Sequence, residues 1–411
     1  MIAGHLPFTG LELDPTMQTQ STHSTVSMLT SLIAPLTVED FFSRYYEQDW
    51  YLAPGTVPAI QDLISVDRID EIIADSELPP NSLSMAKEGR GIPSEEYTHP
   101  NGSIDRGAVL DNYRNGMTIV LPQLQFADGK LYSFCLGLER DFGARIQTNI
   151  YLTPNASQGF GIHYDDHDVL VLQVSGRKKW EIFGQRDGLP YKGEKFRNGE
   201  HDPGELKAEF VIEPGQVLYV PRGLAHRATN AGEEPSLHIT VGILVQTWAE
   251  FMLEAVAEAS LRIPEMRHSL PRSLYFDGGQ RDANEAEFRQ ILAQMVEKIS
   301  FDATVGVFGS NFLTAQGPRV RGALNTLASG ISETDRLSVR PSILYAIDTA
   351  GDEPQLKLGD TVVELKPDLA PQLQALLIKG SMAMSDFTVE DAEDLRDTVE
   401  TLVCYGLLER A

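Results

Sequence analysis

Three residues in the middle of the chain have the types and the spacing of a metal site. His163 and Asp165 lie two positions apart, and His226 follows from a distant part of the chain. On an extended backbone, residues two apart project to the same side, so both side chains can bind one ion. A histidine from another strand would complete one face of an octahedron and leave three positions open. That arrangement suits Fe(II) that must also bind a co-substrate and dioxygen, whereas a closed four-ligand zinc site does not.

The surroundings of His226 strengthen this interpretation, because a His-x-Asp pair alone occurs in surface loops by chance. Two turn segments, Pro214-Gly215 and Pro221-Arg-Gly223, bracket the run from Gln216 to Val220. We therefore expect His226 to lie just beyond a rigid strand, as a ligand that needs a fixed geometry would.

Four further residues lie near these ligands in the sequence or on neighbouring expected strands. His167 could compete as a ligand, although we rank it well below the three residues above. His238 either lines the pocket or is a hydrogen-bonded core histidine, and Tyr151 either forms a wall of the pocket or packs. We interpret Asp168 as a structural hydrogen-bond acceptor.

The elements that must position these residues are short strands. From Arg145 to Val245, β-branched runs alternate with Pro, Gly and Asn turns. These runs cover residues 149–153, 169–174, 179–183, 210–212, 217–220 and 237–244. The pattern predicts a small β-barrel or sandwich.

After Thr247, apolar residues no longer recur at every second position but at about every 3.6 positions, as on one face of a helix. One helical stripe runs from Trp248 to Ala259 and another from Phe288 to Val296, which predicts a helical domain whose stripes serve core packing or subunit contact. The remaining residues mix expected strands (342–347, 361–365) with expected helices (369–378, 389–405), as in a winged-helix-like module. Residues 341–411 hold five Lys and Arg against fourteen Asp and Glu, so docking is favoured over DNA binding.

Composition and charge narrow the class of protein. The 411 residues are 42% hydrophobic and 23% charged, which is typical of a globular protein, and no apolar run approaches the ~18 residues of a membrane span. The net charge of −25 disfavours nucleic acid and anionic membranes and favours a basic macromolecular partner. Only two cysteines occur and the first basic residue is Arg44, so we expect a reducing, cytoplasmic location.

A longer run around the metal motif resembles the JmjC-type ribosomal oxygenases of the cupin superfamily. The run begins Asn149-Ile-Tyr-Leu-Thr-Pro and continues through His163-Tyr-Asp-Asp to Gly176-Arg-Lys178-Lys-Trp180. The resemblance extends more weakly from about residue 35 to the end. It implies an α+β chain with a double-stranded β-helix, a helical dimerisation domain and a C-terminal winged-helix-like domain. The expected parts are an N-terminal arm (1–34), a JmjC/cupin catalytic domain (35–247), a helical domain (248–335) and the last domain (336–411).

Carried over residue by residue, the resemblance makes His163, Asp165 and His226 the Fe(II) ligands. It also places Lys178 at the distal carboxylate of the co-substrate 2-oxoglutarate and Asn149 beside it. The residues themselves favour the same role for Lys178. Gly176 can turn the chain, after which Lys178 shares a face with Trp180, and a lysine that faces a barrel interior is costly unless it meets an anion. The alternative is that these basic residues lie on the solvent-exposed face of a hairpin, which suits Arg177 and Lys179 better than Lys178.

The function that the resemblance implies is hydroxylation of a His or Arg side chain of a basic protein, a ribosomal protein above all, by a homodimeric enzyme. Two alternatives stay open: the same chemistry on another peptide or a small metabolite, and a cupin that binds metal without redox chemistry. Demethylation of methyl-lysine is a weaker possibility. We expect neither direct nucleic-acid binding nor a membrane partner.

Overall fold

The computed structural model describes residues 27–75, 78–87, 90–155, 161–185, 188–197, 199–276, 278–314, 321–340, 343–348 and 353–411. These residues form two compact units that meet in sequence between Val245 and Gln246. The first unit contains all the residues of the expected metal site. Among the described residues, no helix combines the length and the apolar character needed to cross a bilayer.

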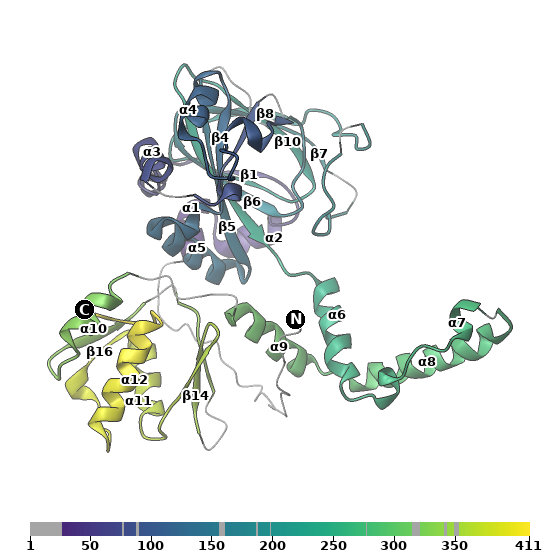
Figure 1. Cartoon of the computed structure of the whole chain (residues 1–411), viewed down its shortest axis with the longest axis vertical. Coiled ribbons are helices and arrows are strands. Elements are labelled where there is room, and N and C mark those ends of the chain that lie inside the picture. The colour runs from purple at the N-terminus through teal and green to yellow at the C-terminus, as the bar shows by residue number, and fades with distance from the viewer. Residues whose placement is uncertain are drawn as a thin grey trace. The chain divides into compact units, whose positions relative to one another are not determined.

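The first unit is built on two antiparallel sheets (Figure 1). The larger sheet has the order β1-β9-β6-β11-β5-β4-β2-β3, and the smaller has the order β10-β7-β8. The strands are β1 (Tyr51–Leu52), β2 (Ser84–Lys87), β3 (Arg90–Gly91), β4 (Thr118–Pro122), β5 (Arg145–Thr153), β6 (Asp168–Ser175), β7 (Lys178–Gln185), β8 (Ala208–Ile212), β9 (Val217–Val220), β10 (Leu224–Asn230) and β11 (Ser236–Leu244).

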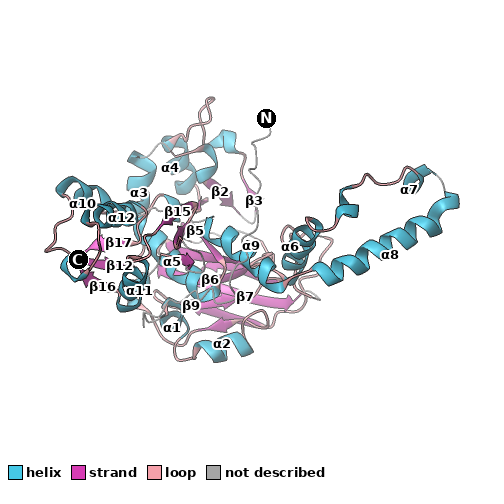
Figure 2. Ribbon diagram, turned by 90° about the horizontal axis from the view of Figure 1, so that it is seen from below, coloured by secondary structure: helices cyan, strands magenta, loops and turns pink. Residues whose placement is uncertain are grey.

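Helices pack against the larger sheet and share an apolar core with it. Figure 2 draws the helices in cyan and the strands in magenta. The helices are α1 (Met28–Ile33), α2 (Val38–Arg44), α3 (Val66–Asp75), α4 (Arg106–Arg114) and α5 (Gly129–Phe142). The side chain of Thr37 accepts a hydrogen bond from the backbone of Asp40 and so caps α2, as the sequence predicts. Outward residues of β5 and β11, such as Ile150 and Ile239, join the core under these helices.

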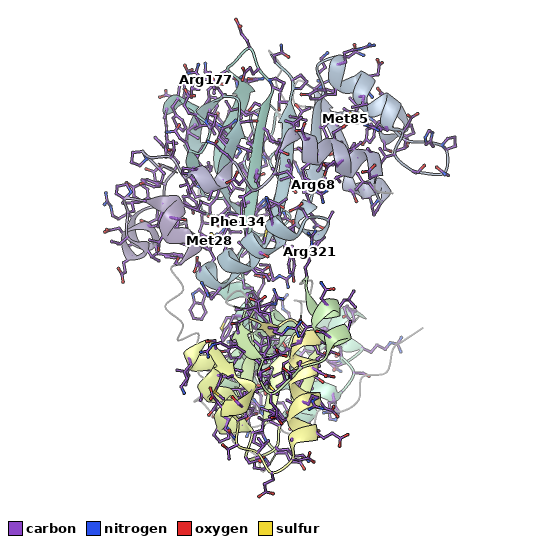
Figure 3. All side chains as sticks on the ribbon, turned by 90° about the vertical axis from the view of Figure 1, so that its left-hand side faces the viewer. Met28, Arg68, Met85, Phe134, Arg177 and Arg321 are labelled. Carbon is purple, nitrogen blue, oxygen red and sulfur yellow. The ribbon has the colours of Figure 1, made fainter. Side chains whose placement is uncertain are left out.

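Helix α1 corrects the expected end of the N-terminal arm. Leu29 and Ile33 are fully buried, and the Leu29 N–H donates to the Asp141 carboxylate of α5. Met28 (Figure 3) packs against α5, since a Cβ atom added at Gly137 would lie 3.5 Å from its side chain, an ordinary van der Waals contact. The packed part of the chain therefore begins before residue 35. The sequence does not reveal this, because the polar residues before α1 dominate the composition of the segment. Residues 1–26 of the expected arm lie outside the described residues.

Between the two sheets lies a second core, which includes Val171 of β6, Trp180 of β7 and Leu224 of β10. Side chains alternate along each strand, so every second residue points into this space. On β5 these inward residues are 149, 151 and 153, and on β11 they are 236, 238 and 240. The expected runs 149–153, 169–174, 179–183, 210–212, 217–220 and 237–244 all fall on strands.

The second unit combines helices with two small sheets. Its helices are α6 (Trp248–Ser260), α7 (Ser273–Phe276), α8 (Arg281–Lys298), α9 (Phe301–Thr314), α10 (Ala323–Ser329), α11 (Ala370–Lys379) and α12 (Ala392–Cys404). One sheet has β16 (Ser381–Ala383), β12 (Arg336–Val339) and β17 (Leu408–Arg410), and the other has β13 (Ala346–Asp348), β14 (Gln355–Leu358) and β15 (Thr361–Glu364).

The last domain begins earlier in the chain than expected. Helix α10 contacts α12 and β17, and Ala323 packs against the C-terminal core. This core therefore begins before residue 336, where the sequence analysis places the boundary. The mixed α/β, cupin-like character of the chain is confirmed, whereas the double-stranded β-helix and the winged-helix-like module stay predictions.

Candidate metal centre and co-substrate pocket

The structure brings His163, Asp165 and His226 together. One ligand atom from each lies within 4.8 Å of the others. The His163 Nε2 atom is 3.9 Å from the Asp165 carboxylate, and the His226 Nε2 atom is 3.8 Å from it. The two imidazole rings lie 4.6 Å apart between their centroids. Three donor atoms of the types that first-row metals prefer therefore converge on one point.

Backbone geometry fixes the two histidines. His163 and His226 form an antiparallel bridge, with backbone N–H···O distances of 3.1 and 2.8 Å. The His163 Nδ1–H donates to the Gly161 carbonyl at 2.8 Å, and the His226 Nδ1–H donates to the Leu224 carbonyl at 2.9 Å. Each ring therefore directs an Nε2 lone pair toward Asp165, which is the usual orientation of a metal-binding imidazole.

The charges at this point suit a cation. Burial alone would raise the pKa of Asp165, but His163 and His226 outweigh that effect and hold the pKa below its usual value. Burial, assisted by His163, lowers the pKa of His226. The carboxylate is thus ionised and the buried imidazole is neutral at physiological pH, which are the forms that bind metal.

His226 follows strand β9, as expected, and itself lies on a further strand that the sequence does not predict. Strand β10 spans Leu224–Asn230 and pairs with β7, with His226 opposite Ile182. The sequence conceals this strand because Gly223 ends the preceding turn and the segment Ala225-His-Arg-Ala has little β-branched character.

Lys178 faces the space between the sheets, as its alternation with Trp180 predicts. Its side chain is 3% exposed, and the Nζ atom donates to the Thr153 hydroxyl at 3.1 Å. The same Nζ atom lies 3.2 Å from the His238 Nδ1 atom. In the part of the chain that the structure describes, no carboxylate lies within ion-pair distance of Lys178. Burial lowers the pKa of Lys178 to about 7.

Neighbouring charges in the same segment pair at the surface. Arg177 forms an ion pair with Glu213 at 2.7 Å, and Lys179 forms one with Glu209 at 2.8 Å. Gly176 makes the turn before them with φ of +64°, and a Cβ atom there would lie 2.2 Å from the Pro235 carbonyl oxygen. The glycine therefore allows β6 and β7 to approach the β10–β11 turn closely.

Aromatic side chains connect the metal ligands with Lys178. Tyr151 and His238 stack nearly parallel, with centroids 4.7 Å apart and planes 7° apart. The Trp180 ring lies 5.6 Å from that of His226 and 6.3 Å from that of His238. The buried indole N–H of Trp180 has no hydrogen-bond partner among the described residues. His238 is thus buried and hydrogen-bonded, as one of its two interpretations requires, and its role in lining a pocket stays a prediction.

Asn149 lies two residues before Tyr151 on the same face of β5, and its side chain forms a hydrogen bond with Tyr151. Burial raises the pKa of Tyr151. Thr153, which the sequence analysis does not single out, completes this face at Lys178. Its signal is the same alternation of side chains that places Lys178 inside.

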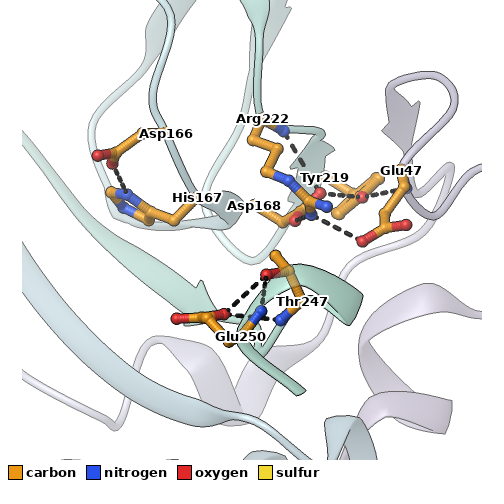
Figure 4. Close-up of polar contacts among 8 residues, drawn as sticks. All are labelled: Glu47, Asp166, His167, Asp168, Tyr219, Arg222, Thr247 and Glu250. Carbon is orange, nitrogen blue, oxygen red and sulfur yellow. Dashed lines mark hydrogen bonds and ion pairs between the residues drawn. The ribbon is translucent and has the colours of Figure 1, made fainter. Parts of the chain in front are cut away.

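His167 and Asp168 have polar partners other than the three ligands (Figure 4). The His167 Nδ1 atom lies 3.1 Å from the Asp166 carboxylate, and the ring packs on Gly242, where a Cβ atom would lie 2.8 Å away. Asp168 is fully buried and accepts hydrogen bonds from Tyr219 at 2.7 Å and from Arg222. The structural role expected for Asp168 matches these contacts.

Comparison with known proteins identifies the domain that carries this site. The family model for the JmjC domain matches residues 129–251. The chain contains a JmjC domain. The matched segment starts at α5 and includes His163, Asp165, Lys178 and His226.

Curated proteins are similar to the chain over a longer stretch. The chain is 31% identical to the Bifunctional lysine-specific demethylase and histidyl-hydroxylase NO66 of Dictyostelium discoideum, over 60% of this chain and 49% of that protein. It is 29% identical to Ribosomal oxygenase 1 of Gallus gallus, over 69% of this chain and 50% of that protein. The chain thus spans about half the length of these relatives. The predicted resemblance to JmjC-type ribosomal oxygenases is confirmed.

A solved structure has the same fold. The ribosomal oxygenase YcfD of Escherichia coli, in complex with cobalt and 2-oxoglutarate, aligns with a TM-score of 0.52 and 18% identity, covering 92% of this chain and 98% of that chain. At this identity the likeness shows the fold alone.

Proposed function

We propose that this chain is an Fe(II)- and 2-oxoglutarate-dependent dioxygenase that hydroxylates a side chain of a protein. One observation carries the proposal: three convergent metal-ligand atoms share the space between the sheets with a buried lysine. A protein that only holds a metal has no need of a buried cation close to it. The names of the curated relatives, histidyl-hydroxylase and ribosomal oxygenase, support the same chemistry.

The residues present fit a six-coordinate transition metal. Two neutral imidazoles and one carboxylate are the donor set of the non-haem Fe(II) oxygenases, and no fourth His, Cys, Asp or Glu joins this group among the described residues. His163, Asp165 and His226 would hold the ion. When bound, Fe(II) would supply the activation of dioxygen, with 2-oxoglutarate as the co-substrate that is oxidised to succinate and carbon dioxide.

The pocket residues fit the co-substrate. An ammonium group has three N–H donors, and Thr153 and His238 accept two of those of Lys178. Among the described residues nothing accepts the third donor, which could therefore bind the distal carboxylate of 2-oxoglutarate. That charge-assisted bond would offset the cost of burying the cation. Asn149 and the indole N–H of Trp180 offer further polar contacts in the same space.

The protein's own part in the reaction is to bind, orient and exclude water. The backbone bridge ties His163, which lies outside the named strands, to His226 on β10, so both ligands are held by main-chain hydrogen bonds. The core around Trp180 keeps the smaller sheet in place and makes the pocket apolar apart from these donors. Such a surrounding strengthens the bond between Lys178 and an anion and limits side reactions with water.

We further propose a ribosomal protein as the substrate and a His or Arg side chain as the target. The net charge of −25 favours a strongly basic partner, as ribosomal proteins are. This acidic surface would also speed association at low salt. An acidic peptide or an anionic metabolite would lack this match of charge.

Product mass spectrometry tests this proposal. The full chain, supplied with Fe(II), 2-oxoglutarate and oxygen, is incubated with total ribosomal protein, and Asp165→Ala is the control. The expected result is one ribosomal peptide that gains the mass of a single oxygen atom, on His or Arg, only with the wild-type chain. Loss of a methyl group from lysine would favour demethylation instead. Turnover of 2-oxoglutarate without any modified ribosomal peptide would contradict the proposed substrate.

We also propose that two copies associate through the helical part of the second unit. Trp248 is 76% exposed and Phe288 is 63% exposed, although both lie on apolar helical stripes. An apolar groove of about 1010 Å³ runs along α7 and α8, which lie side by side (Figure 2). Apolar surface of this extent on a soluble chain usually marks an interface. The cytoplasmic location and the lack of nucleic-acid binding stay predictions.

A further inference from the structure

The hydrogen bond between Lys178 and His238 joins two residues that are distant in sequence and buried together. The Nζ and Nδ1 atoms lie 3.2 Å apart, and His238 is only 4% exposed. Burial and the nearby Lys178 hold the pKa of His238 well below its usual value. The imidazole is therefore neutral, and its Nδ1 atom accepts a hydrogen bond from the ammonium group.

Rings on both sides restrict the His238 side chain. It stacks on Tyr151, with which it is paired in register between β11 and β5. The Trp180 ring meets it edge to face, at an angle of 87°. A partial turn of the ring would break the stacking on Tyr151, and a 180° turn would keep the stacking but would place a carbon atom at Lys178 and leave one of its N–H groups without the acceptor. The direction of this hydrogen bond is therefore set by three strands.

We propose that His238 is a positioning residue for the co-substrate, which rests on the proposed function above. Its Nδ1 atom and the Thr153 hydroxyl together hold the Lys178 ammonium so that the third N–H points into the pocket. His238 would thus affect the affinity only for ligands that have a carboxylate at the end remote from the metal. It would do so through Lys178 rather than by contact with the reacting atoms.

The alternative is that His238 only fills the core. A lysine side chain has several rotamers, so an ammonium held by Thr153 alone, without the His238 acceptor, could adopt other orientations. A purely packing role would depend on the shape of the ring, whereas a positioning role depends on the acceptor atom. These two properties can be separated by substitution.

The test uses His238→Phe, which keeps a ring to stack on Tyr151 and removes the acceptor, and His238→Asn, which keeps an acceptor and removes the ring. Isothermal titration calorimetry on the full chain with Mn(II), under nitrogen, measures the Kd of 2-oxoglutarate and of pyruvate. Pyruvate has the 2-oxo acid group but no distal carboxylate. Lys178→Met is the reference for complete loss of the anchor, and melting temperatures confirm folding.

We expect His238→Phe to weaken the binding of 2-oxoglutarate about tenfold and to leave pyruvate within about twofold of wild type. His238→Asn should recover most of the affinity for 2-oxoglutarate. If His238→Phe binds 2-oxoglutarate as tightly as wild type while Lys178→Met does not, the positioning role is wrong and the proposed function stands. A wild-type chain that binds neither 2-oxo acid would instead overturn the proposed function.

Discussion

His163 and His226 exchange two backbone hydrogen bonds, so the two histidines of the candidate metal centre are direct neighbours across an antiparallel bridge. The bridge depends on main-chain atoms and is independent of the side chains. The geometry of the site is thus built into the fold before any ion binds. Substitution of a single ligand side chain should therefore remove metal affinity while leaving the strands in place.

The pKa of Lys178 predicts a pH dependence of co-substrate binding. The distal carboxylate binds the ammonium form, and burial lowers the pKa of Lys178 to about 7. Below that pH the ammonium is already present, whereas above it binding must take up a proton. The Kd of 2-oxoglutarate should therefore rise with pH, approaching about tenfold per unit well above pH 7.

Groups that face Lys178 do not titrate in this range. The Thr153 hydroxyl is neutral, His238 stays neutral because its pKa is lowered, and Tyr151 stays neutral because its pKa is raised. Titration with pyruvate controls for the metal ligands, because pyruvate lacks the distal carboxylate. Equal pH profiles for the two ligands would show that Lys178 is not the titrating group.

The buried cluster around Asp168 predicts a loss of stability when it is broken. Asp168 accepts hydrogen bonds from Tyr219 and Arg222, and Arg222 also pairs with Glu47 at 2.7 Å (Figure 4). Asp168→Ala should lower the free energy of unfolding by about 3–5 kcal/mol, because it leaves a buried guanidinium with less compensation. Tyr219→Phe should cost about 1–3 kcal/mol.

Urea unfolding followed by circular dichroism measures both changes. Arg177→Ala is the control, since its ion pair with Glu213 is exposed and should contribute less than about 1 kcal/mol. Unfolding of Asp168→Ala at the same urea concentration as Arg177→Ala would argue against a structural role for the cluster.

Gly176→Ala should disturb the position of Lys178. The backbone there has a positive φ, and a Cβ atom would meet the Pro235 carbonyl oxygen at 2.2 Å, so the turn must shift. We expect lower thermal stability and weaker binding of 2-oxoglutarate, measured by a melting curve and calorimetry. Gly55→Ala, at a position with open space around it, is the matched control. Unchanged affinity in Gly176→Ala would show that the turn does not set the position of Lys178.

Strand alternation accounts for the part of the site that could be predicted. It places Lys178 and Trp180 inside and Arg177 outside, and the residue types of His163, Asp165 and His226 suffice to suggest a metal site. The contact between Lys178 and His238 could not be predicted, because it depends on the register of β7, β10, β11 and β5 across the two sheets. Strand β10 was missed for a local reason, since turn residues and weak β-formers conceal it.

The exposed apolar residues of α6 and α8 predict a dimer, and introduction of a charged residue among them should disrupt it. Phe288→Glu should shift the mass measured by light scattering from two copies toward one at micromolar concentration, because burial of a lone carboxylate in an apolar interface is costly. Leu206→Glu, an exposed position in the other unit, is the control. A wild-type chain that is monomeric throughout this range would contradict the dimer.

The most direct measurement is an anaerobic optical titration of the metal-free chain with Fe(II) and 2-oxoglutarate, in wild type, Asp165→Ala and Lys178→Ala. We predict a charge-transfer band between Fe(II) and 2-oxoglutarate in wild type, abolished in Asp165→Ala, and weakened in Lys178→Ala so that it needs at least about tenfold more 2-oxoglutarate. All three proteins should keep the same circular dichroism spectrum. A folded wild-type chain that gives no such band would contradict the assignment of this site to an oxygenase.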